Sequence, residues 1–352
     1  MSCKKLAFNN KMNMKLDEIY EPIASDLETV ENRIASCVED SKSACVRALC
    51  RQMLGQPAKR IRPALAILSE KGVSVGRGGR HSCESEATID LAVAVELIHM
   101  ASLIHDDLID KATMRRGSRS ANARWGANVA VMLGAYIFSK AFELVVRFKI
   151  PGVFECLSEA ACRMCEGEAS QVRQRHNWEL SEDSYIDIAA NKTAALFAGC
   201  CHAATIVGGR GRLVQAAMKQ YGLNLGVAFQ IMDDCMDFTA EEAELGKCPG
   251  QDMLAGDITL PLLSLSQWYV TEKGDRKELT SVGGNSIDRN KLESVREVLV
   301  DSGALCRTQE RIVSHATTAK EYLDVLPGSD YKNSLANLAD YVMQRIPTQA
   351  RR

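Results

Sequence analysis

Two short acidic clusters are the residues of this 352-residue chain best suited to chemistry. In each, two adjacent aspartates are followed, after two other residues, by a third. The clusters are Asp106, Asp107 and Asp110, and Asp233, Asp234 and Asp237. In a helix, aspartates four residues apart lie on one face, where their like charges repel each other. A bound cation would neutralise that repulsion, so each cluster is a candidate metal site.

The type of ligand points to magnesium. Mg²⁺ prefers oxygen ligands, and it keeps several waters when only a few carboxylates bind it. Calcium in an EF-hand would need a DxDxDG loop with a following glutamate, which this sequence lacks. Magnesium held in this way usually also binds substrate phosphates, so the clusters predict a phosphate-binding site. The alternative, two solvated acidic helix ends, stays open on the clusters alone.

Basic residues near the clusters could bind those phosphates. Arg115 and Arg116 follow the first cluster, and Lys59 and Arg62 lie upstream in the run KRIRP. Lys192 interrupts an apolar stretch, AANKTAALF, where a buried lysine needs an anionic partner. Arginine can clamp two phosphate oxygens at once, whereas lysine acts as a point charge. Each residue alone is typical of a surface charge, so the prediction depends on their combination with two acidic clusters.

The elements expected to position these residues are helices. Apolar residues recur every three or four positions through most of the chain, aromatic residues are 5%, and only eight prolines interrupt it. No linker-like change of composition divides the sequence, so we expect one all-α domain over residues 1–352. The expected helices span residues 14–54 with a break near 40, 60–71, 86–110, 120–147, 152–178, 182–208, 210–238, 258–272, 288–302, 303–325 and 329–345.

Composition argues against several functions. Lysine and arginine total 43 against 45 aspartates and glutamates, and this balance speaks against a nucleic-acid partner. No stretch reaches about 18 uninterrupted apolar residues, so we expect no membrane span. The thirteen cysteines lack a disulfide-framework spacing, and the first residues lack the apolar core of a secretory signal. We therefore expect reduced thiols and a cytoplasmic protein.

Taken together, these residues resemble the trans-isoprenyl diphosphate synthases, in particular their long-chain polyprenyl branch. The likeness runs from about residue 17 to residue 341. The resemblance implies an all-α bundle of long helices around a deep central cavity, and usually a homodimer. The motifs that carry it are AKRIRP at 58–63, ELIHMASLIHDDLID at 96–110, MRRG at 114–117, KTA at 192–194, FQIMDDCMD at 229–237, and LGK with a following TLP at 245–261.

The resemblance also implies a reaction, in which isopentenyl diphosphate is joined head-to-tail to an allylic diphosphate primer. Two diphosphates bring a charge of about −6, which about three Mg²⁺ would offset, with Mn²⁺ as a substitute. Metals and basic side chains would stabilise the departing diphosphate, so no covalent nucleophile is needed. The implied metal ligands are Asp106, Asp110 and Asp233, joined by Asp234 and Asp237, with Asp107 in support. The implied ligands of the allylic diphosphate are Arg115, Lys192, Thr193 and Gln230. Those implied for isopentenyl diphosphate are Lys59, Arg62, His99 and Arg116, and Lys247 is a further substrate-binding residue.

Product length depends on the residues four and five positions before the first aspartate. In short-chain relatives these positions carry bulky aromatic side chains, whereas this chain has Ala101 and Ser102. A helix of about 25 residues spans roughly 37 Å, long enough to line a product of roughly C35–C45, with about C15–C20 as the alternative.

One position departs from the family pattern. Asp257 stands where the family generally has a lysine that reaches the allylic diphosphate. A carboxylate there would repel the substrate unless it turned away or bound metal, and Lys247 would still be available. On the sequence alone, we expect replacing Asp257 by lysine to raise activity.

Two rival functions remain at this point. A class I terpene cyclase shares the helical fold, but cyclases usually pair one aspartate-rich motif with a different metal site and need no KRIRP motif. A non-catalytic partner subunit of a prenyl synthase would typically lack one aspartate motif, whereas both are intact here. Asp257 keeps the partner-subunit alternative open.

Overall fold

Helices dominate the computed structural model of the protein, which describes residues 14–55, 58–76, 82–115, 117–147, 149–240, 249–274 and 289–345. The strands in this described part are two residues long, β1 (Met114–Arg115) and β2 (Ser118–Arg119), and they pair antiparallel. The expected all-α class is confirmed. The helical elements are, in chain order, α1 (Leu16–Tyr20), η1 (Glu21–Ile23), α2 (Ala24–Glu39), α3 (Ala44–Leu54), α4 (Ile61–Ser74), α5 (Ser82–Ile109), α6 (Ala121–Trp125), α7 (Ala127–Arg147), α8 (Val153–Arg173), α9 (Glu182–Ala189), η2 (Ala190–Ala194), α10 (Ala195–Val207), α11 (Arg212–Thr239), α13 (Gln251–Ala255), α14 (Leu260–Lys273), α16 (Arg289–Asp301), α17 (Ala304–Tyr322), η3 (Leu323–Val325) and α18 (Asp330–Gln344).

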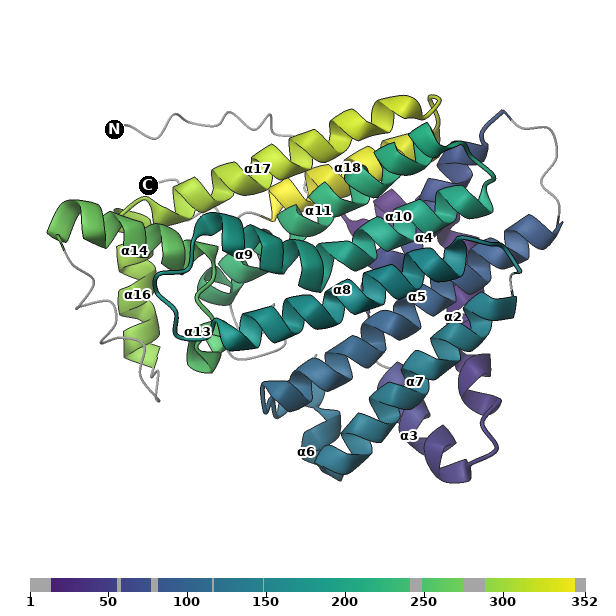
Figure 1. Ribbon diagram of the computed structural model, residues 1–352, viewed down its shortest axis with the longest axis horizontal. Coiled ribbons are helices and arrows are strands. Elements are labelled where there is room, and N and C mark those ends of the chain that lie inside the picture. The colour runs from purple at the N-terminus through teal and green to yellow at the C-terminus, as the bar shows by residue number, and fades with distance from the viewer. Residues whose placement is uncertain are drawn as a thin grey trace.

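The core of the molecule surrounds α5 and α10. Helix α10 packs against α4, α5, α8 and α11, and α5 also packs against α4 and α7. Both helices are apolar on nearly every face, which is typical of a buried helix. Figure 1 shows α8, α10 and α11 running alongside one another, with α17 and α18 above them in this view and α5 and α7 below. The long helices therefore place the ends of α5, α8 and α11 near each other.

Glycines allow two of these helices, α8 and α11, to approach η2 and the start of α10 very closely. A Cβ atom on Gly167 of α8 would lie 2.3 Å from the backbone nitrogen of Lys192. A Cβ atom on Gly226 of α11 would lie 2.6 Å from Cα of Ala194, and one on Gly222 would lie 2.5 Å from the carbonyl oxygen of Phe197. The π-helical turn η2 is therefore clamped between α8 and α11. Single π turns inside helices frequently occur at functional sites, and this one carries Lys192.

Most expected helices agree with the structure to within a few residues. The segment expected at 120–147 is instead two helices, because Gly126 has φ +84° between α6 and α7. The helix expected at 152–178 ends at Arg173, and His176 then adopts φ +62°, a left-handed conformation that a helix cannot continue through. The short helix α13 and the β1–β2 hairpin were not predicted from the sequence.

Two helices are long and apolar enough to cross a membrane by length and composition, Ser85–Ile109 and Ala127–Arg147. The most apolar window of the first is 78% buried inside the protein, as expected for a core helix, whereas that of the second is only 39% buried. One or two such helices are weak evidence for a span. The absence of a membrane span therefore stays a prediction.

Among the cysteines that the structure describes, Cys306 differs from the expectation of reduced thiols. Cys306 takes part in a disulfide, so that expectation is wrong at this position. Sequence spacing did not indicate the bond, because it requires folding to bring a second sulfur against Cys306. The adjacent buried pair Cys200 and Cys201 are free thiols, as expected.

Candidate active site

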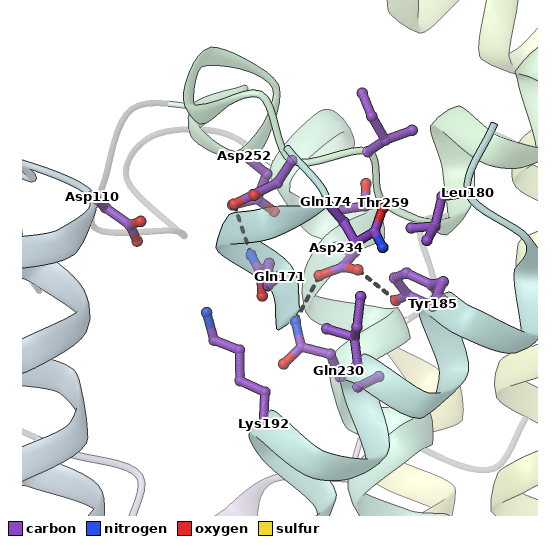
Figure 2. Close-up of a pocket in the computed structure, with 14 residues that line it drawn as sticks. Asp110, Gln171, Gln174, Leu180, Tyr185, Lys192, Gln230, Asp234, Asp252 and Thr259 are labelled. Carbon is purple, nitrogen blue, oxygen red and sulfur yellow. Dashed lines mark hydrogen bonds between the residues drawn. The ribbon is translucent and has the colours of Figure 1, made fainter. Parts of the chain in front are cut away.

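A pocket with an empty volume of about 680 Å³ opens where the ends of α5, α8 and α11 meet (Figure 2). It contains Asp110 from the first acidic cluster and Asp234 from the second. Figure 2 shows these two carboxylates on opposite sides of the pocket, with the Lys192 side chain between them. Besides these three residues the lining comprises Gln171, Gln174, Leu180, Tyr185, Ile188, Ala189, Gln230, Asp252, Asp257, Ile258 and Thr259. The fold therefore brings the two clusters to one pocket, although they lie more than a hundred residues apart in the chain.

Lys192 is the cation at the centre of this site. Its Nζ forms an ion pair of 2.5 Å with Glu168 Oε2 of α8. Burial acts to lower the pKa of Lys192, but Asp106 and Glu168 outweigh it and raise the pKa, so the ammonium keeps its charge. The anionic partner expected for this lysine is thus Glu168, which the sequence alone did not identify.

Within the first cluster, Asp106 is the carboxylate that raises the pKa of Lys192 most. Burial raises the pKa of its carboxyl to about 7, and Glu168 and Asp110 add to the rise, while Lys192 and Arg115 oppose it. A carboxylate crowded by other carboxylates in a partly dry site gains most from a cation. Asp106 therefore has the electrostatic character expected of a metal ligand.

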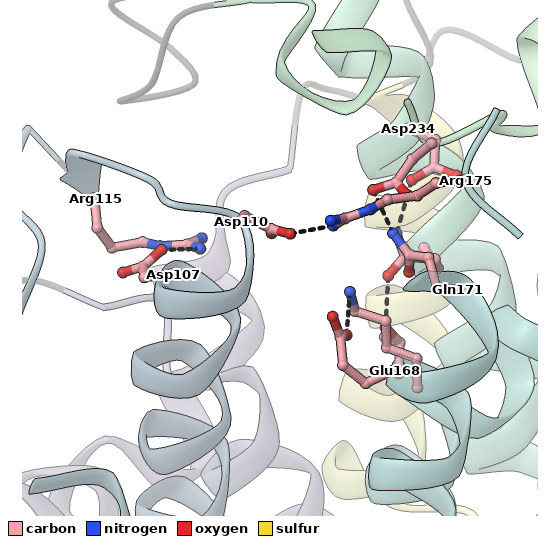
Figure 3. Close-up of polar contacts among 11 residues, drawn as sticks. Asp107, Asp110, Arg115, Glu168, Gln171, Arg175 and Asp234 are labelled. Carbon is pink, nitrogen blue, oxygen red and sulfur yellow. Dashed lines mark hydrogen bonds and ion pairs between the residues drawn. The ribbon is translucent and has the colours of Figure 1, made fainter. Parts of the chain in front are cut away.

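The remaining member of the first cluster, Asp107, turns away from the pocket. It is buried, and its Oδ1 accepts hydrogen bonds from Nε of Arg115 at 2.8 Å and from Nη2 at 2.5 Å (Figure 3). Arg115 lies on β1, so the hairpin and this ion pair fix its position next to the first cluster. Asp107 thus orients Arg115.

The second cluster is held by a network of neutral donors. Tyr185 donates its hydroxyl to Asp234 Oδ2 at 2.5 Å, and Gln230 Nε2 donates to Asp234 Oδ1 at 2.7 Å. Thr193 donates in turn to Gln230 Oε1 at 2.5 Å, so η2 is linked to α11. Burial and the neighbouring Asp252 raise the pKa of Asp234 well above its usual value, while the two donors oppose that rise.

The other two aspartates of the second cluster have opposite environments. Asp237 is fully buried, and its Oδ2 accepts the backbone N–H of Asp252 at 3.2 Å. Asp233 is exposed to solvent, and neither residue lines the pocket. Gln230 contacts Asp234, one helical turn further along the same face of α11.

The basic run upstream of α4 divides into two roles. Arg60 is buried in the core, where it pairs with Glu96 at 2.7 Å and with Glu31. Lys59 is exposed, and the Arg62 guanidinium lies over the Phe197 ring at 4.8 Å from its centroid. Arg60 therefore serves the fold, and Lys59 and Arg62 are the two cations of the run that remain candidates for substrate.

Further predicted residues lie on α5, below the first cluster. His99 is half-buried, and its carbonyl oxygen accepts the Ser102 hydroxyl at 2.8 Å. Ala101 is completely buried. A second, smaller hollow with an empty volume of about 200 Å³ includes Leu97, one turn deeper than Ala101, together with Tyr136 of α7. Two predicted substrate residues, Arg116 and Lys247, lie outside the described residues.

Several residues in or next to the pocket had no signal strong enough to be found from the sequence. They are polar side chains in segments without a recognisable motif, and only their partners indicate a role. Gln171, Tyr185 and Asp252 line the pocket, and Glu168 and Arg175 pair with lining residues. A search for buried polar residues at the helix ends would have been needed to find them.

The donor atoms of the two clusters fit magnesium. They are all carboxylate oxygens, the ligand type that Mg²⁺ prefers. Within the described ranges, no three His, Cys, Asp or Glu side chains lie close enough together to hold a metal by themselves. A metal ion at these carboxylates would therefore need water or substrate phosphate to complete its coordination.

Comparison with known proteins identifies the family. The chain matches the model of the family described as Polyprenyl synthetase over residues 43–299. This protein belongs to the polyprenyl synthetase family. The octaprenyl diphosphate synthase of Escherichia coli is 32% identical to it, over 94% of this chain and 99% of that protein. A short chain isoprenyl diphosphate synthase of Methanothermobacter thermautotrophicus is 33% identical, over 93% of this chain and 99% of that protein.

Solved structures agree with this family. A polyprenyl synthase from Caulobacter crescentus, complexed with calcium and isoprenyl diphosphate, matches with a TM-score of 0.86 and 31% identity, over 96% of this chain and 99% of that chain. The protein therefore has the all-α isoprenoid synthase fold, and it is an enzyme of the polyprenyl diphosphate synthase type, a prenyltransferase. The resemblance inferred from the motifs is confirmed.

Proposed function

We propose that this polyprenyl synthetase condenses isopentenyl diphosphate head-to-tail with an allylic diphosphate in a Mg²⁺-dependent reaction, and that its product is a long trans-polyprenyl diphosphate. The observation that carries the proposal is the pocket in which Asp110 and Asp234 lie on opposite sides of Lys192. Opposed carboxylates with a cation between them suit a diphosphate bridged by metal ions. When bound, magnesium would act as a Lewis acid on the diphosphate leaving group.

The residues of the chain have distinct parts in this reaction. Asp106, Asp110 and Asp233 hold the metal ions, and Asp234 and Asp237 support the second cluster. Lys192, kept charged by Glu168, binds the allylic diphosphate and stabilises the negative charge that develops as its C–O bond breaks. Arg115, Thr193 and Gln230 bind the same group. Lys59, Arg62 and His99, with Arg116 and Lys247, bind the substrates as the family resemblance implies.

A long product requires space beneath the first cluster. Ala101 and Ser102 are too small to block it, and the hollow at Leu97 and Tyr136 lies further along the same helix. Leu97 is nine residues before Asp106, a distance of about 13 Å along a helix. We therefore propose a product of roughly C35–C45 that passes down α5. Because relatives of similar identity include both octaprenyl and short chain synthases, relatedness alone does not determine this length.

A product assay tests the reaction and its length together. The purified protein is incubated with farnesyl diphosphate, isopentenyl diphosphate and Mg²⁺, and its products are sized. Elongated linear chains support a synthase, cyclic hydrocarbons would indicate a cyclase, and a lack of turnover would indicate a partner subunit. The double variant Ala101→Phe, Ser102→Phe should give shorter products, with Ser102→Ala as the control. Products of unchanged length would contradict the proposed path along α5.

We also propose a homodimer of single-domain chains in the cytoplasm. Helix α7 is apolar along its length but leaves Val131, Met132 and Val146 exposed, and Phe154 of α8 is exposed nearby in the chain. Exposed apolar side chains at both ends of one helix are consistent with a surface that another protein covers. Light scattering should give the mass of a dimer, and Met132→Asp should reduce that mass to one chain. A monomeric parent protein would contradict this assembly.

A further inference from the structure

Arg175 links two carboxylates that come from distant parts of the chain and line the same pocket. It lies in the turn after α8. Its Nε donates to Asp257 Oδ1 at 3.2 Å, and its Nη2 donates to Asp110 (Figure 3). Asp110 belongs to the first acidic cluster, and Asp257 precedes α14. The guanidinium therefore joins the end of α5 to the opposite side of the pocket.

Several contacts besides the ion pair join the Arg175 segment to the Asp257 segment. Next to Arg175, the backbone N–H of His176 donates to the carbonyl oxygen of Gly256 at 2.7 Å. A Cβ atom on Gly256 would lie 2.3 Å from the His176 ring, so the two segments are in direct contact. Gln171 Nε2 also donates to the second oxygen of Asp257 at 2.7 Å. Both oxygens of Asp257 are thus engaged by neighbouring donors.

The attachment to Asp110 is of a different kind. Asp257 is buried with 7% of its side chain exposed, whereas 31% of the Asp110 side chain is exposed at the end of a helix. Asp110 is also one of the carboxylates proposed to bind metal. An arginine has five N–H donors in a fixed fork, so a guanidinium held by Asp257 through Nε still presents its Nη groups to another anion.

We propose that Arg175 is a diphosphate-binding residue and that Asp257 is its positioning residue, an inference that rests on the proposed function. Arg175 is paired with both Asp110 and Asp257. If Asp110 bound a cation, Arg175 would keep its bond to Asp257 and its Nη2 would donate to an oxygen of the substrate diphosphate. Asp257, which stands where the family generally has a lysine, therefore does not repel the substrate. Its negative charge is paired with the Arg175 guanidinium at the pocket.

The sequence alone predicts that a lysine at position 257 raises activity, whereas the role of Arg175 predicts the opposite. A lysine at position 257 would lie beside the Arg175 guanidinium and remove the carboxylate that holds it. Two adjacent cations repel each other, so Arg175 would be displaced from the pocket. We therefore expect Asp257→Lys to weaken diphosphate binding rather than to raise activity.

The inference is tested by calorimetric titration of inorganic pyrophosphate into the full-length protein in the presence of Mg²⁺. Arg175→Gln should weaken binding at least about tenfold, because a charge-assisted bond to the diphosphate is lost. The matched control is Arg173→Gln, an exposed arginine two residues earlier on α8. Titration at about 0.15 M salt limits long-range effects of charge, because the screening length is then about 8 Å. An affinity of Arg175→Gln within twofold of the control would overturn the proposal.

Two further variants separate binding from a structural role. Arg175→Lys keeps the charge but loses the fork, so its loss should be about threefold, and it replaces the glutamine variant if that protein does not fold. Asp257→Asn should weaken pyrophosphate binding in the parent protein but have no effect in the Arg175→Gln background, since Asp257 acts through Arg175. Equal losses in both backgrounds would overturn the role assigned to Asp257.

The same titrations distinguish this inference from the proposed function. If the parent protein binds Mg²⁺–pyrophosphate and elongates a primer while Arg175→Gln binds equally well, only the role of Arg175 is wrong. If the parent protein neither binds pyrophosphate nor elongates a primer, both the inference and the proposed function are overturned.

Discussion

The two acidic clusters have the same sequence pattern but different physical environments. Around the first cluster the partners are cations. Arg115 pairs with Asp107, Arg175 pairs with Asp110, and the charge of Asp106 raises the pKa of Lys192. Around the second cluster the donors to Asp234 are neutral, a tyrosine hydroxyl and a glutamine amide, and a backbone N–H donates to Asp237.

The same aspartate motif therefore has different physical properties in the two clusters. The first cluster leaves Asp106 and Asp110 partly exposed, with Asp110 paired to Arg175, and the charge of Lys192 opposes the rise that burial causes in the pKa of Asp106. The second buries Asp234 and Asp237 in hydrogen bonds that fix their orientation before any ligand arrives. We infer that the first cluster rearranges on binding and that the second is preorganised, which lowers the cost of assembling the site.

The largest effect should come from removing a metal ligand of the first cluster. Asp106→Asn should lower kcat/KM about a thousandfold, or ~4 kcal/mol, because a Lewis acid at the leaving group is lost. Steady-state kinetics with farnesyl and isopentenyl diphosphates measure this effect. Asp107→Asn is the matched comparison within the cluster, and only about a tenfold loss is expected because Asp107 acts through Arg115. Equal losses of kcat/KM in the two variants would mean that the half-buried Asp106 and the buried Asp107 have the same role.

An intermediate effect should come from the second cluster, and it should appear in stability. Tyr185→Phe removes the hydroxyl that donates to the buried Asp234, so we expect a loss of about 1–3 kcal/mol in the free energy of unfolding. Urea denaturation of the metal-free protein measures it. Tyr322→Phe is a control, since its hydroxyl forms no hydrogen bond recorded within the described part of the chain. An unchanged unfolding midpoint for Tyr185→Phe would show that Asp234 is not preorganised.

The smallest effect should be the pH dependence of the first cluster. The pKa of Asp106 is raised from 3.8 to about 7, so the folded protein binds this proton more tightly than the unfolded chain does. Its contribution to stability is therefore present below about pH 4 and is lost as the pH rises through about 7. Metal coordination must displace the same proton, so the affinity for Mg²⁺–pyrophosphate should fall by up to about tenfold per pH unit below 7.

Calorimetry in buffers of different ionisation enthalpy measures this proton release. The Asp106→Asn variant should release fewer protons than the parent protein near pH 6.5, because its amide does not titrate. Proton release that is identical in the two proteins would assign the titration to another group.

Much of the fold could be predicted from local sequence. Helix α11 was expected at 210–238 and spans Arg212–Thr239, and α17 was expected at 303–325 and spans Ala304–Tyr322. The periodicity of apolar residues reports directly on which face of a helix is buried, so neighbouring residues contain the needed information. The break at Gly126 was missed because a glycine is compatible with a helix as well as with a positive φ.

The sequence predicted which types of residue form the candidate site, but not which side chains form ion pairs with one another. The spacing of the aspartates and the position of Lys192 within an apolar run indicated a metal and phosphate site, and that part belongs to the sequence alone. Which aspartates are buried, and that Glu168 holds Lys192 and Asp257 holds Arg175, depended on contacts between residues 24 and 82 positions apart. Such contacts are decided by how helices pack, because close approach at Gly167 and Gly256 brings together segments that no local pattern connects.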